Sequence, residues 1–252
     1  MKIFVISMEK SKERRATIAE RLNQLGLSFE FFDAIDGHSL TESEIILSTR
    51  EPNYAIERGE VGCSLSHLSV YAKMVALNIS SALIIEDDAI LSQELPCVLE
   101  ELEKRACDRP LITLLTQTDQ FIASPLLQLG STHCVHRFIE GTGAYGYIIN
   151  NKAAKKLINF LYPVWLVSDR WQFIRENNIC DTQCIVPSVI SHPPYEKDAL
   201  HKISTIHSGV NLSNIKNSIW KKIKKKRPIK IKLQRILWLI FTRRFLKIVR
   251  NS

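Results

Sequence analysis

Three consecutive carboxylates, Glu86, Asp87 and Asp88, directly follow the apolar run at residues 83–85. Such a run is typical of a strand buried on both faces, whose carboxyl end emerges where open α/β folds bind ligands. Adjacent carboxylates repel one another unless a cation lies between them, and Mg²⁺ and Mn²⁺ prefer oxygen ligands that they share with phosphates. The triplet therefore predicts either a metal and diphosphate site, or a solvated turn or helix N-terminus, where acidic residues are also favoured.

The first 37 residues contain the elements that would hold such a site. Residues 2–7 are predicted as a strand, residues 10–25 as a helix ended by Gly26, and residues 29–32 as a second strand followed by a turn. Strand, helix and strand in this order form a βαβ unit, which implies a parallel sheet with a right-handed crossover. Arg14 and Arg15 lie in the first turns of the helix, where they either reach a diphosphate through bidentate hydrogen bonds or are surface charges.

Further elements follow on both sides of the triplet. Residues 57–67 lead into a helix that reaches Leu77, and His67 near its start is either a structural histidine or a donor to a phosphate or sugar. Helices are also predicted at residues 91–107 and 152–161, and strands at 111–115 and 135–139 and after the glycines of 141–146. Residues 116–130 give no clear prediction. Asp169 stands between aromatic residues as either a general base or a helix N-cap.

The composition is that of a globular protein, with 45% hydrophobic and 24% charged residues among 252, enough for one domain or one domain with an appendage. The six cysteines form no CxxC pair, and the N-terminus lacks the apolar core of a secretion signal. We therefore expect a reducing compartment and free thiols. Cys180 and Cys184 lack nearby histidine spacing, which disfavours a metal site there.

Charge divides the chain into two parts. No Asp or Glu follows Asp198, and residues 199–252 contain 15 Lys and Arg, which leaves 19 basic residues against 26 acidic ones in the body. A cationic tail on an anionic body is typical of proteins that bind nucleic acid or an acidic membrane surface. Residues 229–249 mix basic and large apolar side chains, and their apolar core is too short to span a bilayer. This pattern favours a helix in the plane of an anionic membrane over a nucleic-acid arm or a helix packed on the body.

Six stretches resemble glycosyltransferase family 25, the bacterial lipooligosaccharide (LPS) biosynthesis galactosyltransferases. They are residues 5–7, 14–15, 29–37, 59–67, 83–89 and 143–145, and their order and spacing cover most of residues 1–190. The resemblance implies an α/β fold of GT-A type, with a mostly parallel sheet flanked by helices, and inverting transfer of a hexose, most often galactose, from a UDP-sugar. Family members place an Asp soon after a Pro-Val pair, whereas Pro163-Val164 is followed here by Trp165, and Asp169 is the nearest candidate.

The resemblance also assigns roles. Residues 1–200 would form the catalytic domain and residues 201–252 a basic amphipathic helical tail. Glu86 and Asp88 would bind Mn²⁺ or Mg²⁺ at the donor phosphates and so offset charge on the departing UDP, and Asp169 would be the general base that inversion needs. Gly143, Ala144 and Tyr145 would contact the acceptor. The expected donor-binding residues are Val5, Ile6, Ser7, Arg14, Arg15, Asp33, Ala34, Asp36, Gly37, Ser66, His67 and Asp87.

The expected partners are a UDP-sugar donor, a lipid-linked glycan acceptor and an anionic membrane surface, with no nucleic acid. This places the protein in the cytoplasm, peripheral at the inner face of the inner membrane. Two alternatives use the same features: a non-catalytic protein that binds nucleic acid or a partner through the basic tail, and a metal-dependent phosphotransfer enzyme. The absence of a GxxxxGK[ST] loop from the sequence disfavours the P-loop version of the second.

Overall fold

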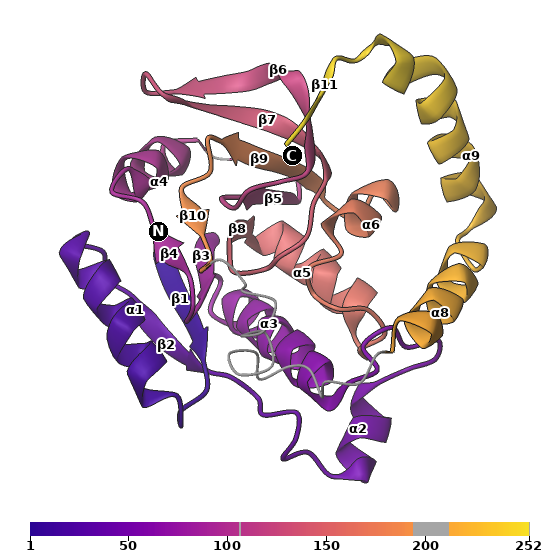
Figure 1. Ribbon diagram of the computed structural model, residues 1–252, viewed down its shortest axis with the longest axis horizontal. Helices are drawn as coiled ribbons and strands as arrows, with labels where there is room; N and C mark the ends of the chain where they lie inside the picture. The colour runs from indigo at the N-terminus through magenta and orange to yellow at the C-terminus, as the bar shows by residue number, and fades with distance from the viewer. Residues whose placement is uncertain (106, 194–211, 252) are drawn as a thin grey trace.

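The computed structural model describes residues 1–105, 107–193 and 212–251 (Figure 1). Within these ranges, nine strands form one central sheet and two short strands, β4 (Ile90–Leu91) and β10 (Ile190–Ser191), pair separately. The strands of the central sheet are β1 (Lys2–Ser7), β2 (Glu30–Asp33), β3 (Ser81–Glu86), β5 (Leu111–Leu114), β6 (Gln120–Leu129), β7 (His133–Glu140), β8 (Gly146–Asn150), β9 (Asp181–Val186) and β11 (Ile248–Arg250). Their order across the sheet is β11-β6-β7-β9-β5-β8-β3-β1-β2.

Most strands of this sheet run in one direction. In the described residues β1, β2, β3, β5, β6 and β9 point one way, and β7, β8 and β11 point the other. The predicted βαβ unit is present, because β1 and β2 are parallel neighbours joined by α1 (Lys12–Gln24). The stretch that gave no clear prediction contains β6, which forms an irregular antiparallel hairpin with β7.

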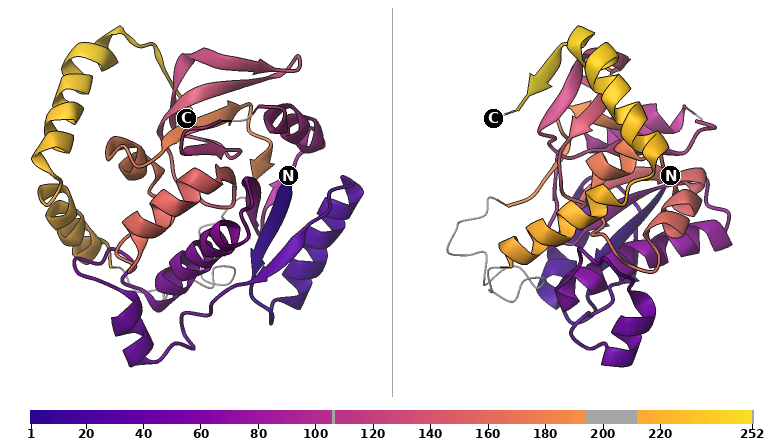
Figure 2. Two further views of the ribbon diagram at one scale, coloured as in Figure 1. Left: turned by 180° about the vertical axis from the view of Figure 1, so that it is seen from behind. Right: turned by 90° about the vertical axis from the view of Figure 1, so that its right-hand side faces the viewer.

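Helices cover both faces of the sheet, and β1 shows how. Its side chains alternate, so that Phe4 and Ile6 join a core with α3 (Arg58–Ala76), α5 (Asn151–Leu161) and α6 (Trp171–Glu176). Ile3 and Val5 join a second core with α1 and α4 (Leu95–Glu103). This three-layer arrangement, which Figures 1 and 2 show from three sides, confirms the predicted α/β class with a sheet flanked by helices.

The C-terminal segment is packed on the body at two places. Helix α8 (Ser213–Lys225) inserts Ile223, which is 2% exposed, and Trp220, whose ring centroid lies 5.1 Å from that of Phe173. After α9 (Ile229–Leu237), η1 (Trp238–Thr242) and η2 (Arg243–Phe245), strand β11 pairs with β6. Figure 1 shows this segment as an arc along one side of the molecule. The predicted boundary between residues 200 and 201 lies outside the described residues.

Helices α8 and α9 agree with the helical tail expected from the sequence, and their contact with the body is one of the three alternatives left open for it. None of the helices in the described ranges combines the length and the apolar character needed to cross a bilayer. Short helix α2 (Glu42–Ser48) begins at a capping box, in which Thr41 and Glu44 exchange hydrogen bonds.

Candidate functional site

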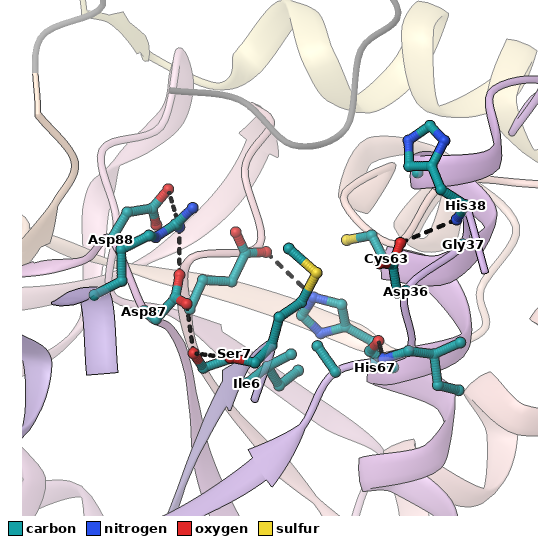
Figure 3. A pocket seen from close by; sticks show the side chains of 16 residues that line it. Ile6, Ser7, Asp36, Gly37, His38, Cys63, His67, Asp87 and Asp88 are labelled. Carbon is teal, nitrogen blue, oxygen red and sulfur yellow. Dashed lines mark hydrogen bonds and ion pairs between the residues drawn. The ribbon is translucent and has the colours of Figure 1, made fainter. Parts of the chain in front are cut away.

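A cavity of about 140 Å³ lies at the carboxyl ends of β1 and β3. The parallel register brings these ends together, because Ile6 stands beside Glu86 and Ser7 stands beside Asp33. In Figure 3, Asp87 and Asp88 lie on one side of the cavity, and Cys63 and His67 on α3 lie on the other. The predicted residues that line it are Ile6, Ser7, Arg14, Ala34, Asp36, Gly37, Ser66, His67, Glu86, Asp87 and Asp88.

Two of the three adjacent carboxylates share Arg14 as a partner, and the third contacts His67. Ser7 Oγ donates a hydrogen bond to Asp87 Oδ2 at 2.5 Å. The guanidinium of Arg14 ion-pairs with Asp87 and, at 3.1 Å, with Asp88. Glu86 turns to His67 instead, with 3.2 Å between Oε1 and Nε2. Asp87 is only 7% exposed, whereas the side chains of Glu86 and Asp88 are each 25% exposed, and the guanidinium of Arg14 bridges Asp87 and Asp88.

Burial leaves Asp88 with unused binding capacity. Burial raises the pKa of Asp87. Burial, together with the negative charge of Glu86, also raises the pKa of Asp88 to about 6, although the positive charge of Arg14 acts in the opposite direction. Asp88 Oδ1 is buried and has no hydrogen-bond partner among the described residues. An orphaned buried acceptor costs roughly 1–3 kcal/mol, which a bound cation or donor would remove. Asp88 therefore fits the chemistry of a metal ligand.

His67 is a fully buried link between the triplet and the core. Its Nδ1 is 2.7 Å from the Tyr147 hydroxyl, which in turn is 2.6 Å from the Tyr71 hydroxyl. These contacts fix the ring so that Nε2 faces Glu86. His67 is thus buried and hydrogen-bonded at both ring nitrogens, and it also lines the cavity wall.

A close backbone contact positions the loop after β2. A Cβ atom added to Gly37 would lie 1.7 Å from the Arg58 carbonyl oxygen, and one added to Gly62 would lie 2.4 Å from the Gly37 nitrogen. Ser66 Oγ accepts a hydrogen bond from the Ile35 amide at 2.8 Å. Only glycine fits at both positions, and the contact holds Asp36 and Gly37 at the cavity. Asp36 is also ion-paired with Lys10.

Three predicted donor-binding residues do not line the cavity. Val5 is fully buried in the core beside α1. Arg15 and Asp33 ion-pair with each other, and Arg15 Nη2 also donates to the Ser7 carbonyl oxygen at 2.8 Å. Arg15 and Asp33 therefore connect the ends of β1 and β2 to each other. Val5, within β1, packs in the core on the α1 side of the sheet.

The expected acceptor residues and Asp169 form a separate cluster beside the triplet. Gly143 donates its amide to Asp169 Oδ2 at 3.1 Å, and its carbonyl accepts from Trp171 Nε1 at 2.8 Å. The Tyr145 carbonyl accepts from the Glu86 amide at 3.3 Å, which ties this segment to the triplet. Ala144 is buried. The N-cap of α6 is Arg170, so the N-cap alternative for Asp169 is wrong.

Sequence reasoning missed five residues that line the cavity: Met8, Ile35, His38, Gly59 and Cys63. Met8 and Ile35 carry no chemical signal, and they are found only by adjacency to predicted residues. Cys63 lacks a CxxC partner, so the cysteine spacing alone indicates only a free thiol. Its spacing of four residues from His67, on one helix, is the signal that places both side chains on the same face.

Comparison with known families matches residues 1–171 to Glycosyltransferase family 25 (LPS biosynthesis protein). A Glycosyltransferase 25 family member of Aedes aegypti is 38% identical over 95 residues, which cover 34% of this chain and 16% of that protein. A Haemophilus influenzae protein, named provisionally as a glycosyltransferase, is 26% identical over 230 residues, which cover 86% of this chain and 81% of that protein. Mouse procollagen galactosyltransferase 2 is 27% identical over 172 residues, or 62% of this chain and 27% of that protein. This chain thus spans only a small part of the insect and mouse relatives.

Proposed function

The chain belongs to glycosyltransferase family 25, and from this premise we propose that it transfers a hexose from a UDP-sugar to a glycan acceptor with inversion. The observation that carries the proposal is the cavity at the ends of β1 and β3, which lies wholly within the residues that match the family. Ligands of open α/β sheets bind at such carboxyl edges. Ile6, Ser7 and the loop at Asp36 and Gly37 would hold the uridine and ribose.

The charge of the cavity supports a divalent cation as part of donor binding. Four carboxylates line it, those of Asp36, Glu86, Asp87 and Asp88, against the single guanidinium of Arg14. A diphosphate would be repelled by this excess of negative charge unless a cation bound with it. Mn²⁺ or Mg²⁺ suits such oxygen ligands and commonly bridges phosphates.

Glu86 and Asp88 would hold this cation, since Asp88 Oδ1 is buried without a partner among the described residues. The bound ion would offset the charge that develops on the departing UDP. Arg14 keeps Asp87 and the second oxygen of Asp88 in place through its two ion pairs. His67 orients Glu86, and Ser7 orients Asp87.

Asp169 would take the proton of the acceptor hydroxyl. Its carboxylate is held by the Gly143 amide, and Gly143 begins the segment expected to contact the acceptor. Asp169 and Glu86 are both among the carboxylates whose charges raise the pKa of the Cys63 thiol, which supports a position of Asp169 close to the cavity wall at Cys63. A general base in hydrogen-bond reach of the acceptor is what inversion requires.

The comparisons support the choice of sugar and acceptor. The mouse relative is named as a galactosyltransferase, which supports galactose as the donor hexose. The description of the family as an LPS biosynthesis protein supports a lipid-linked glycan of the lipooligosaccharide type as acceptor.

The tail would hold the enzyme at an anionic membrane, on the cytoplasmic face where such acceptors are assembled. Phe241 and Phe245 are 65% and 83% exposed and lie next to Arg243 and Arg244. Exposed aromatic side chains flanked by cations suit the interface of an anionic bilayer. The same apolar side chains make a nucleic-acid arm the weaker alternative, because phosphate tracking needs charge alone.

The direct test is transfer from UDP-galactose, UDP-glucose and UDP-N-acetylgalactosamine, with and without Mn²⁺. We expect Asp88→Ala to lower kcat/KM about a thousandfold, because the cation supplies several kcal/mol of charge stabilisation. Asp108→Ala is the matched control, since the Asp108 side chain is 99% exposed and its ion pair within the described residues is with Lys152. Equal turnover by Asp88→Ala, or indifference to a chelator, would rule out the metal. No transfer from any donor would rule out the function.

Asp169→Asn tests the proposed base without removing its loop contact. The Asn side-chain oxygen still accepts the hydrogen bond from the Gly143 amide but cannot take a proton. We expect transfer to fall about a hundredfold or more, with donor binding unchanged by calorimetry. Wild-type turnover would mean that the base lies elsewhere.

A further inference from the structure

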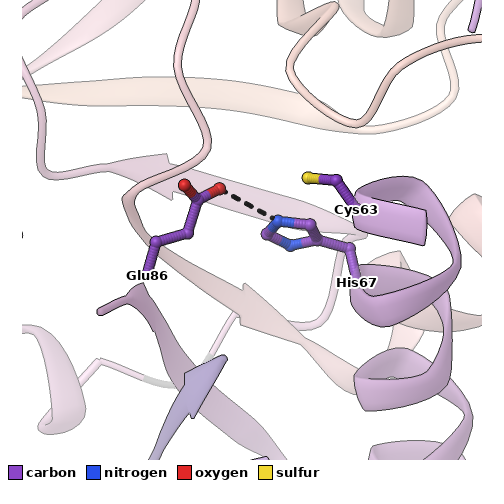
Figure 4. Close-up of side chains that lie close together, drawn as sticks. All are labelled: Cys63, His67 and Glu86. Carbon is purple, nitrogen blue, oxygen red and sulfur yellow. Dashed lines mark hydrogen bonds and ion pairs between the residues drawn. The ribbon is translucent and has the colours of Figure 1, made fainter. Parts of the chain in front are cut away.

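Three metal-ligating atoms of different kinds converge at one corner of the cavity. The thiol of Cys63, a ring nitrogen of His67 and a carboxylate oxygen of Glu86 all lie within 4.8 Å of one another. Figure 4 shows the three side chains pointing toward one another, two from α3 and one from the end of β3. No other cluster of this kind occurs in the described ranges.

The His67 ring is held as metal-bound histidines are held. One ring nitrogen is 2.7 Å from the Tyr147 hydroxyl, which leaves the other free to face the ligand position. The distance from this second nitrogen to Glu86 Oε1 is 3.2 Å. Two ligands at about 2.0–2.1 Å from a tetrahedral ion are about 3.3 Å apart. The pair therefore needs little rearrangement to share one ion.

Negative charge at this corner is not balanced by side-chain cations. Among the described residues, neither Glu86 nor Asp169 has a Lys or Arg nitrogen within 4.0 Å. The other carboxylates near the Cys63 thiol are paired, since Asp88 pairs with Arg14 and Glu60 pairs with Lys216 of α8. Glu86 thus brings to the meeting point of the three donor atoms a negative charge that no Lys or Arg nitrogen within 4.0 Å offsets in the described ranges.

A hydrogen bond from His67 to Glu86 alone accounts for two of the three residues. It leaves out the Cys63 thiol, which has no hydrogen-bond partner within the described part of the chain and points to the same place. A cation bound at this corner would convert the thiol to a ligand, since metals bind the thiolate form.

We propose that Cys63, His67 and Glu86 form a binding site for a divalent cation of the zinc class. Thiolate and imidazole donors select Zn²⁺ or Co²⁺ over Mg²⁺, which takes oxygen ligands. The site does not use Asp88, so it is distinct from the cation proposed for the donor phosphates. Glu86 is common to both, so a zinc-class ion at this corner would compete for that carboxylate.

Titration of the full, reduced chain with Co²⁺ alone tests the site, after removal of metals by a chelator. We expect one equivalent to produce the thiolate-to-cobalt charge-transfer band and the visible bands of tetrahedral cobalt, both lost on adding Zn²⁺. Cys63→Ser should abolish the charge-transfer band, and His67→Gln should weaken binding about tenfold or more. Cys97→Ser is the control, because Cys97 is an exposed free cysteine outside the site.

A band that is absent from the wild type, or that survives Cys63→Ser, overturns the proposal. Circular dichroism of Cys63→Ser, a near-isosteric change, separates loss of the site from loss of the fold. Because Asp88 is not a ligand here, Asp88→Ala should keep the cobalt band while losing sugar transfer. A missing band with normal transfer therefore overturns this site alone, and a band without transfer overturns only the proposed function.

Discussion

The cavity at the ends of β1 and β3 and the contact of the C-terminal segment from α8 to α9 with the body are both built on one charged group shared by two partners. In the cavity a single cation, Arg14, serves the carboxylates of Asp87 and Asp88. At the contact a single carboxylate, Glu176, serves Arg227 at 2.8 Å and Arg235 at 3.2 Å. The first region is left with surplus negative charge, and the second with surplus positive charge.

The surplus differs in where it lies. The unbalanced carboxylates line a concave cavity, where a cation with an anionic substrate can satisfy them. The unbalanced Lys and Arg side chains lie on exposed helices beside apolar side chains, where an extended anionic surface suits them better. Ion pairs thus stabilise both regions, and in each region the charged side chains that have no opposite charge beside them are available to bind a ligand or a surface.

The largest expected loss of stability comes from disrupting the backbone contact of Gly37 with α3, which positions the loop beside the cavity. Gly37→Ala places a Cβ atom 1.7 Å from a backbone oxygen of α3, which cannot move alone. We expect the free energy of unfolding to fall by about 3 kcal/mol or more, measured by urea titration. Gly26→Ala, with φ +65 and nothing within 4 Å, should cost only about 1–2 kcal/mol. Equal losses would contradict the role of the contact.

The second effect breaks the tail contact at its shared carboxylate. Glu176→Gln leaves the buried Arg227 guanidinium, 7% exposed, without a countercharge. We expect about 3 kcal/mol of lost stability, with faster hydrogen exchange in α8. Glu42→Gln removes an exposed pair with Arg58 and should cost less than about 1 kcal/mol. Unchanged exchange in α8 would show that aromatic packing alone holds the helix.

Acid should loosen the tail contact in a defined direction. Burial alone would raise the pKa of Glu176, but the guanidiniums of Arg227 and Arg235 outweigh it and hold the pKa below its ordinary value of 4.5. The released carboxylate therefore binds protons more readily than the docked one. The contact contributes fully above about pH 4.5 and weakens as the pH falls further. Tryptophan fluorescence should report this loss, and Glu176→Gln should lack it.

The smallest expected effect on stability comes from substitutions on the exposed face of the tail, which should instead weaken membrane binding. Phe241→Ser with Phe245→Ser should change the free energy of unfolding by less than about 0.5 kcal/mol, because both side chains are exposed. Sedimentation with phosphatidylglycerol liposomes should nevertheless fall several-fold. Ile46→Ser, on exposed α2, is the control for general loss of apolar surface. Unaltered sedimentation would contradict membrane binding through this face.

Local pattern predicted the first βαβ unit and the carboxylate triplet, because apolar runs and turn residues act over a few positions. It did not predict that Arg14 pairs with Asp87 and Asp88, or that Ser7 binds Asp87, 80 residues away. These contacts depend on the register between β1 and β3. The sequence suggested Arg14 as a phosphate ligand, whereas in the structure its guanidinium forms ion pairs with Asp87 and Asp88.

The tail illustrates a different limit. Its amphipathic pattern predicts that one apolar face is removed from water, but either a membrane or a protein surface can bury the same apolar side chains. Trp220 and Ile223 face the body, while Phe241 and Phe245 are exposed, and no periodicity distinguishes the two pairs. Only the position of Phe173 and Tyr54, supplied by distant parts of the chain, decides which side chains are buried.

The segment from α8 to β11 is held to the body at several points: Trp220 packs on Tyr54, Arg235 of α9 pairs with Glu176, and β11 pairs with β6. A segment attached to a domain at one point lets the domain rotate relative to it, whereas a segment attached at more than one point moves with the domain as one rigid unit. Any surface that grips α9 would therefore set the orientation of the whole body, and with it the direction in which the cavity opens. The orientation of the body, as well as its affinity for that surface, would then decide which acceptors could reach the proposed site.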